Sequence, residues 1–328
     1  MKHFYKIKLL IKDSSSYVVI LSEAKNLSTP TQNDIREIKD LARTNTKLKP
    51  LKKADLQVVK PVKTTKYSDI DLNNWKAYDH VKTDTLWEFP NRLKEGGHSN
   101  EYHGNYIPQI AQQLYERFTK KGDVVLDLFF GSGTSGIEAI NMGRRCIGVE
   151  LKDELAEKVS EKFTPKQLVT DVRVICTDSA SEQVRDKVQC ALDIMGEEKA
   201  QFLILHPPYD DIIKFSDKKE DLSNCESTEQ FYELFGKVAK NGYDMLEKGR
   251  FAALIIGDSY KNSEVQPLGF ECMAKMMNLG FKLKGIIVKD IQGNERAKGK
   301  TANLWRYRAL AGGFFIFKHE YVMIFEKK

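Results

Sequence analysis

From about residue 84 onward, short apolar runs alternate with amphipathic segments along the chain. The runs at 124–128, 145–151 and 172–176 are each followed by apolar residues at helical spacing. Strands that alternate with helices predict a doubly wound, parallel α/β sheet, because each helix returns the chain to the same end of the sheet. The last two runs, 281–288 and 314–325, have no obvious helix between them and predict an antiparallel hairpin on one edge.

The first 80 residues have a different composition. Two short β-like runs, 4–11 and 17–21, are followed by a polar stretch, and residues 43–67 carry eight cations against a single acid, Asp55. Such a segment is typical of a solvated linker, with contact to a polyanionic backbone as the alternative. We therefore predict an N-terminal extension with a basic arm over 1–80 and the main domain over 84–328.

Composition limits the class of protein further. The chain has 328 residues and a net charge of +6, which permits a polyanionic partner without requiring one. Its five cysteines are odd in number and form no CxxC pair, so we expect reduced thiols and no metal site. No apolar run approaches 18 residues, and the Lys-rich start lacks a signal-peptide pattern. These features predict a soluble, intracellular protein.

A glycine-rich turn follows the first strand of the regular region. The sequence from Asp127 to Gly136, DLFFGSGTSG, matches GxGxxG at a strand-to-helix junction. Glycines there let the backbone approach a ligand closely, and the helix N-terminus favours a negative group. This pattern alone is a weak signal, since enzymes that bind a nicotinamide dinucleotide need the same turn.

Three acidic residues at strand ends narrow the choice of ligand. Asp127 precedes the turn, where a carboxylate suits a cationic group better than a pyrophosphate. Glu150 ends the second strand and could accept both hydroxyls of a ribose, although charged strand ends are often merely solvated. Asp178 follows the third strand and could accept from an adenine amine. Together they favour S-adenosylmethionine, with a dinucleotide as the alternative.

The apolar run 202–205 ends in His206-Pro207-Pro208-Tyr209. Two adjacent prolines have fixed φ and no N–H, so the strand ends in a stiff corner rich in acceptors. Carbonyl and side-chain acceptors would face the N–H bonds of a flat amine, and the tyrosine ring would stack on its plane. The corner indicates an enzyme that acts on a nucleobase.

Five segments resemble, in a consistent order, the amino-methyltransferases of DNA, which methylate adenine N6 or cytosine N4. DLFFGSGT at 127–134 resembles the family's cofactor motif, and HPPY at 206–209 resembles its catalytic motif. Residues 103–108 are similar to the family's segment that closes over the methionine moiety of the cofactor. Residues 143–150 are similar to its second strand, and residues 319–327 to its last strand. The resemblance spans about 84–328. It implies the class I methyltransferase fold, a seven-stranded, mostly parallel sheet with one antiparallel edge strand.

The resemblance also implies S-adenosylmethionine as the cofactor and a set of site residues. The cofactor would be held by nine residues, Asp127, Phe129, Gly131, Gly133, Thr134, Glu150, Asp178, His103 and Pro108. The catalytic corner would be His206, Pro207, Pro208 and Tyr209. There the side chain at 206 and the Pro207 carbonyl would accept from the exocyclic amine, and Tyr209 would stack on a flipped base.

His206 departs from the family's usual Asp, Asn or Ser at this position. A neutral imidazole has one acceptor nitrogen and loses it on protonation, so we expect activity to fall as pH drops through the His206 titration. A flat profile from pH 5.5 to 8 would count against this hypothesis. Two alternatives are a histidine that only caps the strand and a substitution that marks an inactive subunit.

Target recognition is expected outside the core of the domain. The roughly 70 residues between the glycine turn and the corner are needed for the strands and helices of the sheet itself. The segments that remain for target recognition are the first 80 residues and a basic loop at about 290–312. The loop residues expected to contact DNA are Arg296, Lys298, Lys300, Trp305, Arg306 and Arg308. The alternative is a solvated loop with Trp305 packed on the sheet edge.

The sequence therefore predicts a site-specific DNA methyltransferase, with adenine N6 slightly preferred over cytosine N4, in restriction–modification or a related defence. We expect a cytoplasmic prokaryotic enzyme that acts on nucleoid DNA, without membrane or metal. A homodimer or a restriction-system partner stays open. The alternatives are an RNA base or protein-glutamine methyltransferase, an inactive DNA-binding subunit and a dinucleotide oxidoreductase. Cytosine C5 chemistry is disfavoured, because it needs a Pro-Cys pair that the chain lacks.

Overall fold

The chain divides into two compact units, Met1–Val62 and Lys63–Lys328, which are considered separately. The computed structural model describes residues 6–13, 16–22, 62–93, 96–98, 104–209, 213–261, 264–291 and 302–328. In the first unit, strand β1 (Lys6–Asp13) pairs antiparallel with β2 (Ser16–Ser22). These strands lie where the sequence predicts two β-like runs.

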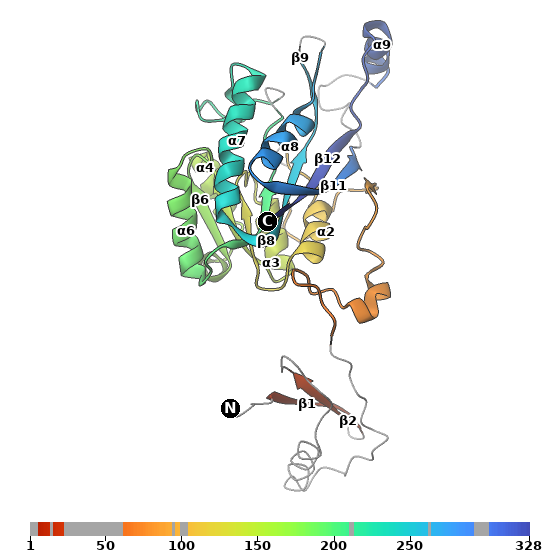
Figure 1. The fold of residues 1–328 in the computed structure, drawn as a ribbon, viewed down its shortest axis with the longest axis vertical. Coiled ribbons are helices and arrows are strands. Elements are labelled where there is room, and N and C mark those ends of the chain that lie inside the picture. The colour runs from red at the N-terminus through yellow and green to blue at the C-terminus, as the bar shows by residue number, and fades with distance from the viewer. Residues whose placement is uncertain are drawn as a thin grey trace. The chain divides into compact units, whose positions relative to one another are not determined.

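The second unit is built on one eight-stranded sheet (Figure 1). Its strands follow one another in the order β3 (Leu86–Trp87), β11 (Phe281–Asp290), β12 (His319–Lys327), β8 (Leu246–Ile256), β7 (Ala200–Leu205), β4 (Val124–Asp127), β5 (Arg145–Glu150) and β6 (Val172–Cys176). Strand β12 is antiparallel to both of its neighbours, and the other pairs are parallel. The predicted α/β fold of the class I methyltransferase type is confirmed.

Two details of that prediction are wrong. The two-residue strand β3 joins the edge of the sheet and makes eight strands instead of seven. The antiparallel strand β12 is also not at the edge, because β11 and β3 lie outside it. The burial patterns explain this order. Residues Val322–Phe325 are all buried, as a strand covered on both faces requires, whereas Lys282 and Lys284 of β11 are exposed.

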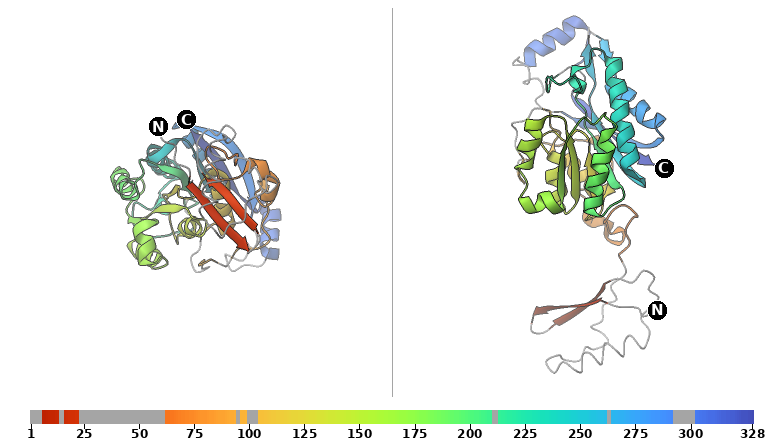
Figure 2. Two further views of the ribbon diagram at one scale, coloured as in Figure 1. Left: turned by 90° about the horizontal axis from the view of Figure 1, so that it is seen from below. Right: turned by 90° about the vertical axis from the view of Figure 1, so that its left-hand side faces the viewer.

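Helices cover both faces of the sheet and enclose two cores (Figures 1 and 2). One face packs against α6 (Gln183–Met195), α7 (Thr228–Met245) and α8 (Leu268–Asn278); the other packs against α2 (Pro108–Phe118), α3 (Thr134–Asn141) and α4 (Asp153–Ser160). Strand β7 shows the alternation, since Leu203 and Leu205 enter the first core while Phe202 and Ile204 enter the second.

Several smaller elements complete the unit and were not foreseen from the sequence. They are the 3-10 turns η2 (Leu72–Tyr78) and η3 (Leu222–Asn224), helix α5 (Pro165–Thr170), the hairpin of β9 (Ser259–Lys261) with β10 (Glu264–Gln266), and helix α9 (Ala302–Gly312). The predicted loop at 290–312 is therefore wrong over its second half. Helix formers such as Ala302, Leu304 and Ala309 explain the helix. The last strand begins at His319, five residues later than predicted.

Residues 63–80 belong to the second unit. The ring of Tyr67 lies 4.7 Å from that of Phe251, and Ser68 Oγ donates to the Glu116 carbonyl at 3.0 Å. The expected domain boundary near residue 80 stays a prediction, but this part of the extension packs on the sheet unit.

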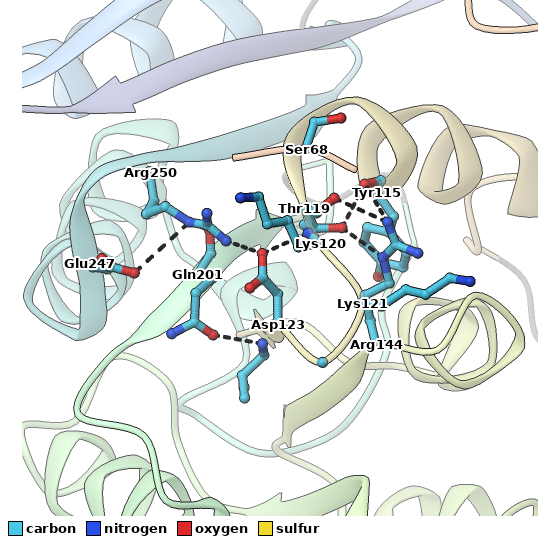
Figure 3. A network of polar contacts seen from close by, with 12 residues as sticks. Ser68, Tyr115, Thr119, Lys120, Lys121, Asp123, Arg144, Gln201, Glu247 and Arg250 are labelled. Carbon is cyan, nitrogen blue, oxygen red and sulfur yellow. Dashed lines mark hydrogen bonds and ion pairs between the residues drawn. The ribbon is translucent and has the colours of Figure 1, made fainter. Parts of the chain in front are cut away.

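A network of buried polar contacts fills the amino end of the sheet (Figure 3). The Arg250 guanidinium pairs with the Asp123 carboxylate, and its Nε donates to the Gln201 carbonyl at 3.0 Å. Nearby, Arg144 donates to the hydroxyl and the carbonyl oxygen of Thr119, both at 3.0 Å. Both arginines are buried: Arg250 ties β8 to β7 and to the residue before β4, and Arg144 ties the residue before β5 to the end of α2.

Candidate active site

A cavity of about 270 Å³ lies at the carboxyl end of the parallel strands. Four segments wall it: the turn after β4, the end of β5, the residues after β6 and the corner after β7. The segments 104–106 and 213–222 and the side chain of Glu320 complete the lining. Open α/β sheets bind ligands at this edge, where neighbouring crossovers leave in opposite directions.

The glycine turn lies on the floor of this cavity through Leu128, Phe129 and Gly131. Gly133 is the N-cap of α3 with a φ of +81°, and a Cβ there would lie 2.4 Å from Val159. This position therefore needs glycine for both its backbone conformation and its space. The cavity wall includes neither Gly133 nor Thr134. These two residues therefore contribute to the shape of the turn and not to the cavity lining.

Two of the predicted carboxylates line the cavity. Glu150 Oε2 accepts from the Gly131 N–H and its Oε1 accepts from the Lys152 N–H, both at 2.9 Å. Asp178 Oδ1 accepts from the Ala180 N–H at 2.8 Å. Burial raises the pKa of both groups. Each carboxylate oxygen has two lone pairs, so both side chains keep acceptor capacity for a ligand's hydroxyl or amine.

Asp127 lies behind the turn rather than on the cavity wall. It is 1% exposed, and its oxygens accept from Ser135 Oγ at 2.5 Å and from the Phe129 N–H at 2.9 Å. Burial raises its pKa to about 6, against the opposing effect of these hydrogen bonds. The predicted contact of Asp127 with a cationic ligand group stays a prediction.

The corner His206-Pro207-Pro208-Tyr209 lines the cavity with all four residues. The Tyr106 ring meets the His206 ring edge-on, with centroids 5.2 Å apart. Burial lowers the pKa of His206 to about 4, while Glu320 opposes and Lys289 supports this shift. The imidazole is therefore neutral from pH 5.5 to 8. A flat activity profile over that range now agrees with a histidine acceptor, which corrects the test proposed from the sequence.

Sequence reasoning missed two charged residues beside this corner. Tyr209 Oη donates to Glu320 Oε2 at 2.8 Å, and Lys289 Nζ lies 3.1 Å from Glu320 Oε1. Both side chains of this ion pair are only 8% exposed. Glu320 and Lys289 are register partners in the β11–β12 hairpin. The available signal was a lysine directly after the apolar run 286–288 and a glutamate close before the apolar run 322–325.

The remaining predicted residues are spread more widely. Pro108 is buried as the first residue of α2. His103, Arg296, Lys298 and Lys300 lie outside the described residues, as does the side chain of Trp305. Arg306 and Arg308 are exposed on helix α9. Their predicted contact with DNA is untested.

Two further searches were confined to the described residues. Within these parts of the chain, no three His, Cys, Asp or Glu side chains are grouped so that they could hold a metal ion. None of the described helices has the length and the apolar character needed to cross a membrane.

A family model described as DNA methylase matches residues 8–161. The match includes the glycine turn and Glu150 and ends before the corner at 206–209. Its description agrees with the resemblance drawn from the motifs, and S-adenosylmethionine is the cofactor that this family implies.

Individual relatives are similar over shorter stretches. The probable type III restriction-modification enzyme HindVI Mod subunit of Haemophilus influenzae is 34% identical over 100 residues, 29% of this chain and 13% of that protein. The type II methyltransferase M.BglI of Bacillus subtilis is 33% identical over 81 residues, 24% of this chain and 22% of that protein.

The matched stretches thus span less than a quarter of these relatives' lengths. Among solved structures, TrmN from Thermus thermophilus is 17% identical with a TM-score of 0.43, covering 69% of this chain and 50% of that one. The family match, the relatives and the ordered motifs agree. Over the stretches that they match, this chain is similar to the DNA amino-methyltransferases.

Proposed function

We propose that this protein transfers a methyl group from S-adenosylmethionine to an exocyclic amine of a base in DNA. The observation that carries the proposal is that one cavity is lined both by the Pro-Pro corner at 206–209 and by Glu150 and Asp178. A single cavity with these two walls could hold a methyl donor against a flat amine. The match to the DNA methylase family model and the restriction–modification names of the relatives support DNA as the substrate.

The residues present fit this cofactor. The Glu150 carboxylate is 8% exposed, held in place by two backbone N–H groups and open to the cavity, as a pair of ribose hydroxyls requires. Asp178, on the next strand connection, lines the same cavity and would accept from an adenine amine. When bound, the sulfonium supplies an electrophilic methyl group and a neutral leaving group, so the protein needs no covalent nucleophile.

The corner residues would act on the target amine. Its nitrogen is a weak nucleophile because the lone pair is delocalised into the ring. Hydrogen bonds from its N–H groups to the His206 imidazole and the Pro207 carbonyl would draw the nitrogen toward tetrahedral geometry and restore the lone pair. The stiff Pro207-Pro208 backbone would hold these acceptors in line with the methyl group, and such positioning supplies much of the rate.

We further propose adenine N6 as the preferred target over cytosine N4, and a role in restriction–modification or a related defence in the prokaryotic cytoplasm. The basic residues of the 290–312 segment, among them the exposed Arg306 and Arg308 of α9, would contact DNA phosphates beside the cavity. A restriction subunit or a second copy of the chain is the partner that this role implies.

The decisive experiment expresses the full chain in a host without DNA methylation. Nucleoside mass spectrometry of the host DNA should detect N6-methyladenine, and sequencing should place it at one recognition sequence. The matched control is Pro207→Ala, which should retain cofactor binding by calorimetry and lower methylation at least tenfold. N4-methylcytosine would instead correct the target base. Unmodified DNA together with modified RNA, or with tight S-adenosylmethionine binding alone, would overturn the proposal.

A further inference from the structure

The corner at 206–209 is connected to a buried ion pair that the proposed reaction does not use. Four side chains form a chain of contacts: His206 Nε2 lies 3.4 Å from Tyr209 Oη, Tyr209 Oη lies 2.8 Å from Glu320 Oε2, and Glu320 Oε1 lies 3.1 Å from Lys289 Nζ. Buried charges of this kind are costly in an apolar core and are often associated with function. The question is what this pair does for the corner.

The direction of the hydrogen bonds follows from the donors available. Burial, and then the Glu320 carboxylate, raises the pKa of Tyr209 well above its usual value, so the phenol keeps its single proton. It donates that proton to Glu320, which accepts from Lys289 on its other oxygen. Tyr209 Oη can then only accept from His206, so the proton of the neutral imidazole must be on Nε2.

We propose that Glu320 is a positioning residue for methyl transfer: through Tyr209 it keeps the His206 proton on Nε2 and makes Nδ1 the acceptor for the exocyclic amine. This inference rests on the proposed function. Lys289 stabilises the charge of Glu320 and so keeps it an acceptor. Tyr106, edge-on to the His206 ring, is the other titratable group packed against the imidazole.

A second chain of contacts from a histidine through a tyrosine to a carboxylate begins on β12, the strand that carries Glu320. His319 Nε2 lies 3.2 Å from Tyr321 Oη, which donates to Asp258 Oδ2 at 3.2 Å. None of these three residues belongs to the cavity wall. The described residues therefore include two His–Tyr–carboxylate relays, one that contains cavity residues and one that does not.

The test uses the full chain labelled with ¹⁵N-histidine, with His206 assigned by comparison with His206→Asn. Long-range ¹H–¹⁵N correlation spectra distinguish the two imidazole tautomers. The wild type should carry the proton on Nε2. In the double variant Lys289→Met with Glu320→Leu, Tyr209 keeps only His206 Nε2 as its acceptor, so the proton should move to Nδ1. Removing both charges together leaves neither member of this ion pair buried alone, which favours folding.

Glu320→Gln is the second variant and should invert the tautomer by another route. Its amide has one acceptor oxygen for two donors, and the Lys289 ammonium forms the stronger, charge-assisted hydrogen bond. The amide NH₂ then faces Tyr209, which must donate to His206. Both variants should lower kcat by about 100-fold, which is the lower end of the range for a side chain that takes part in general acid–base catalysis. The S-adenosylmethionine Kd should change by less than about threefold. Asp258→Asn, the control in the second relay, should leave kcat within about twofold of wild type.

Several outcomes would overturn the inference. One is a wild-type His206 with its proton on Nδ1, and another is an unchanged tautomer in both variants. A third is an inverted tautomer with unchanged kcat, which would leave Glu320 a purely structural residue. A wild type with the expected tautomer that binds S-adenosylmethionine and methylates no DNA would instead refute the proposed function, so the two failures can be told apart.

Discussion

At the amino end of the sheet, buried guanidinium groups donate to carboxylate, carbonyl and hydroxyl oxygens, whereas at the carboxyl end the carboxylates of Glu150 and Asp178 accept from backbone N–H groups. Arg250 pairs with Asp123, and Arg144 is enclosed by the oxygens of Thr119. At the other end, Glu150 accepts from the N–H groups of Gly131 and Lys152, and Asp178 accepts from the N–H of Ala180. The same eight strands therefore carry two kinds of polar site.

The two ends of the sheet differ in how much hydrogen-bonding capacity their polar groups keep for a ligand. A guanidinium that is paired with a carboxylate and a carbonyl has little capacity left for a ligand, so the amino end contributes stability. A carboxylate that accepts one backbone N–H on each oxygen still has free lone pairs. The raised pKa values of Asp127, Glu150 and Asp178 show the energetic cost of burying these groups. Such a cost is typical of binding sites.

The largest expected effect is on stability at the amino end. Arg250→Met leaves the Asp123 carboxylate largely buried without its partner and should lower the free energy of unfolding by about 3 kcal/mol or more. Urea denaturation measures this loss, and the S-adenosylmethionine Kd should be unchanged. Lys284→Met, which removes a half-exposed partner of Glu326, is the control and should cost less than about 1 kcal/mol. Equal losses for both variants would abolish the distinction between the two ends.

A complementary substitution at the carboxyl end should affect binding more than stability. Glu150→Gln removes the charge that strengthens hydrogen bonds to ribose hydroxyls, so the S-adenosylmethionine Kd should rise by about 30-fold. The free energy of unfolding should fall by about 1–2 kcal/mol, less than for Arg250→Met, because the amide NH₂ faces one of the two backbone N–H donors from which the carboxylate accepts. Isothermal titration calorimetry gives the Kd. An unchanged Kd would mean that Glu150 does not contact the cofactor.

Asp127→Asn should stabilise the protein, unlike a change at the amino end. The pKa of Asp127 is about 6 in the folded state, above its ordinary value of 3.8, so the folded state binds more protons between these values. Stability therefore falls as pH rises through this window, and the ionised side chain costs up to about 3 kcal/mol at pH 7. The variant should recover about 1–3 kcal/mol at pH 7 and progressively less toward pH 4. A loss of stability at pH 7 would show that the hydrogen bonds to Ser135 and Phe129 outweigh burial.

The smallest expected effect is the pH dependence of the chemical step. Because the pKa of His206 is about 4, the imidazole is already neutral at pH 5.5 and keeps its acceptor nitrogen at higher pH. We expect kcat at saturating substrates to change by less than about twofold from pH 5.5 to 8 and to decline only as pH falls toward 4. A decline centred near pH 6.5 would contradict the burial of His206 in the working enzyme.

The strand ends and their motifs could be predicted because they depend on local sequence. An apolar run followed by glycines or prolines fixes where a strand stops, and parallel strands bring their carboxyl ends to one edge. The sequence therefore predicted that Glu150, Asp178 and the corner at 206–209 would meet. The structure places all of them on one cavity.

The ion pair beside Tyr209 could not be predicted in this way. Glu320 is 111 residues from Tyr209 in sequence, and its position depends on the register of the β11–β12 hairpin and on the insertion of β12 inside the sheet. Helix α9 was missed for another reason. Cations and aromatics over 296–308 were interpreted as a loop for DNA contact, although alanines and leucines over 302–310 favour a helix.

The antiparallel course of β12 has a consequence for how this protein could diversify. Strand β11 ends at Asp290, and β12 begins at His319, directly opposite in the ladder. The whole segment 291–318 thus leaves and re-enters the sheet between two paired residues at the edge that carries the cavity. A segment with adjacent, fixed ends can be lengthened, shortened or exchanged without altering strand order. Under the proposed function, the segment that would contact DNA could therefore change in length or sequence while the strands that carry the cavity stay the same.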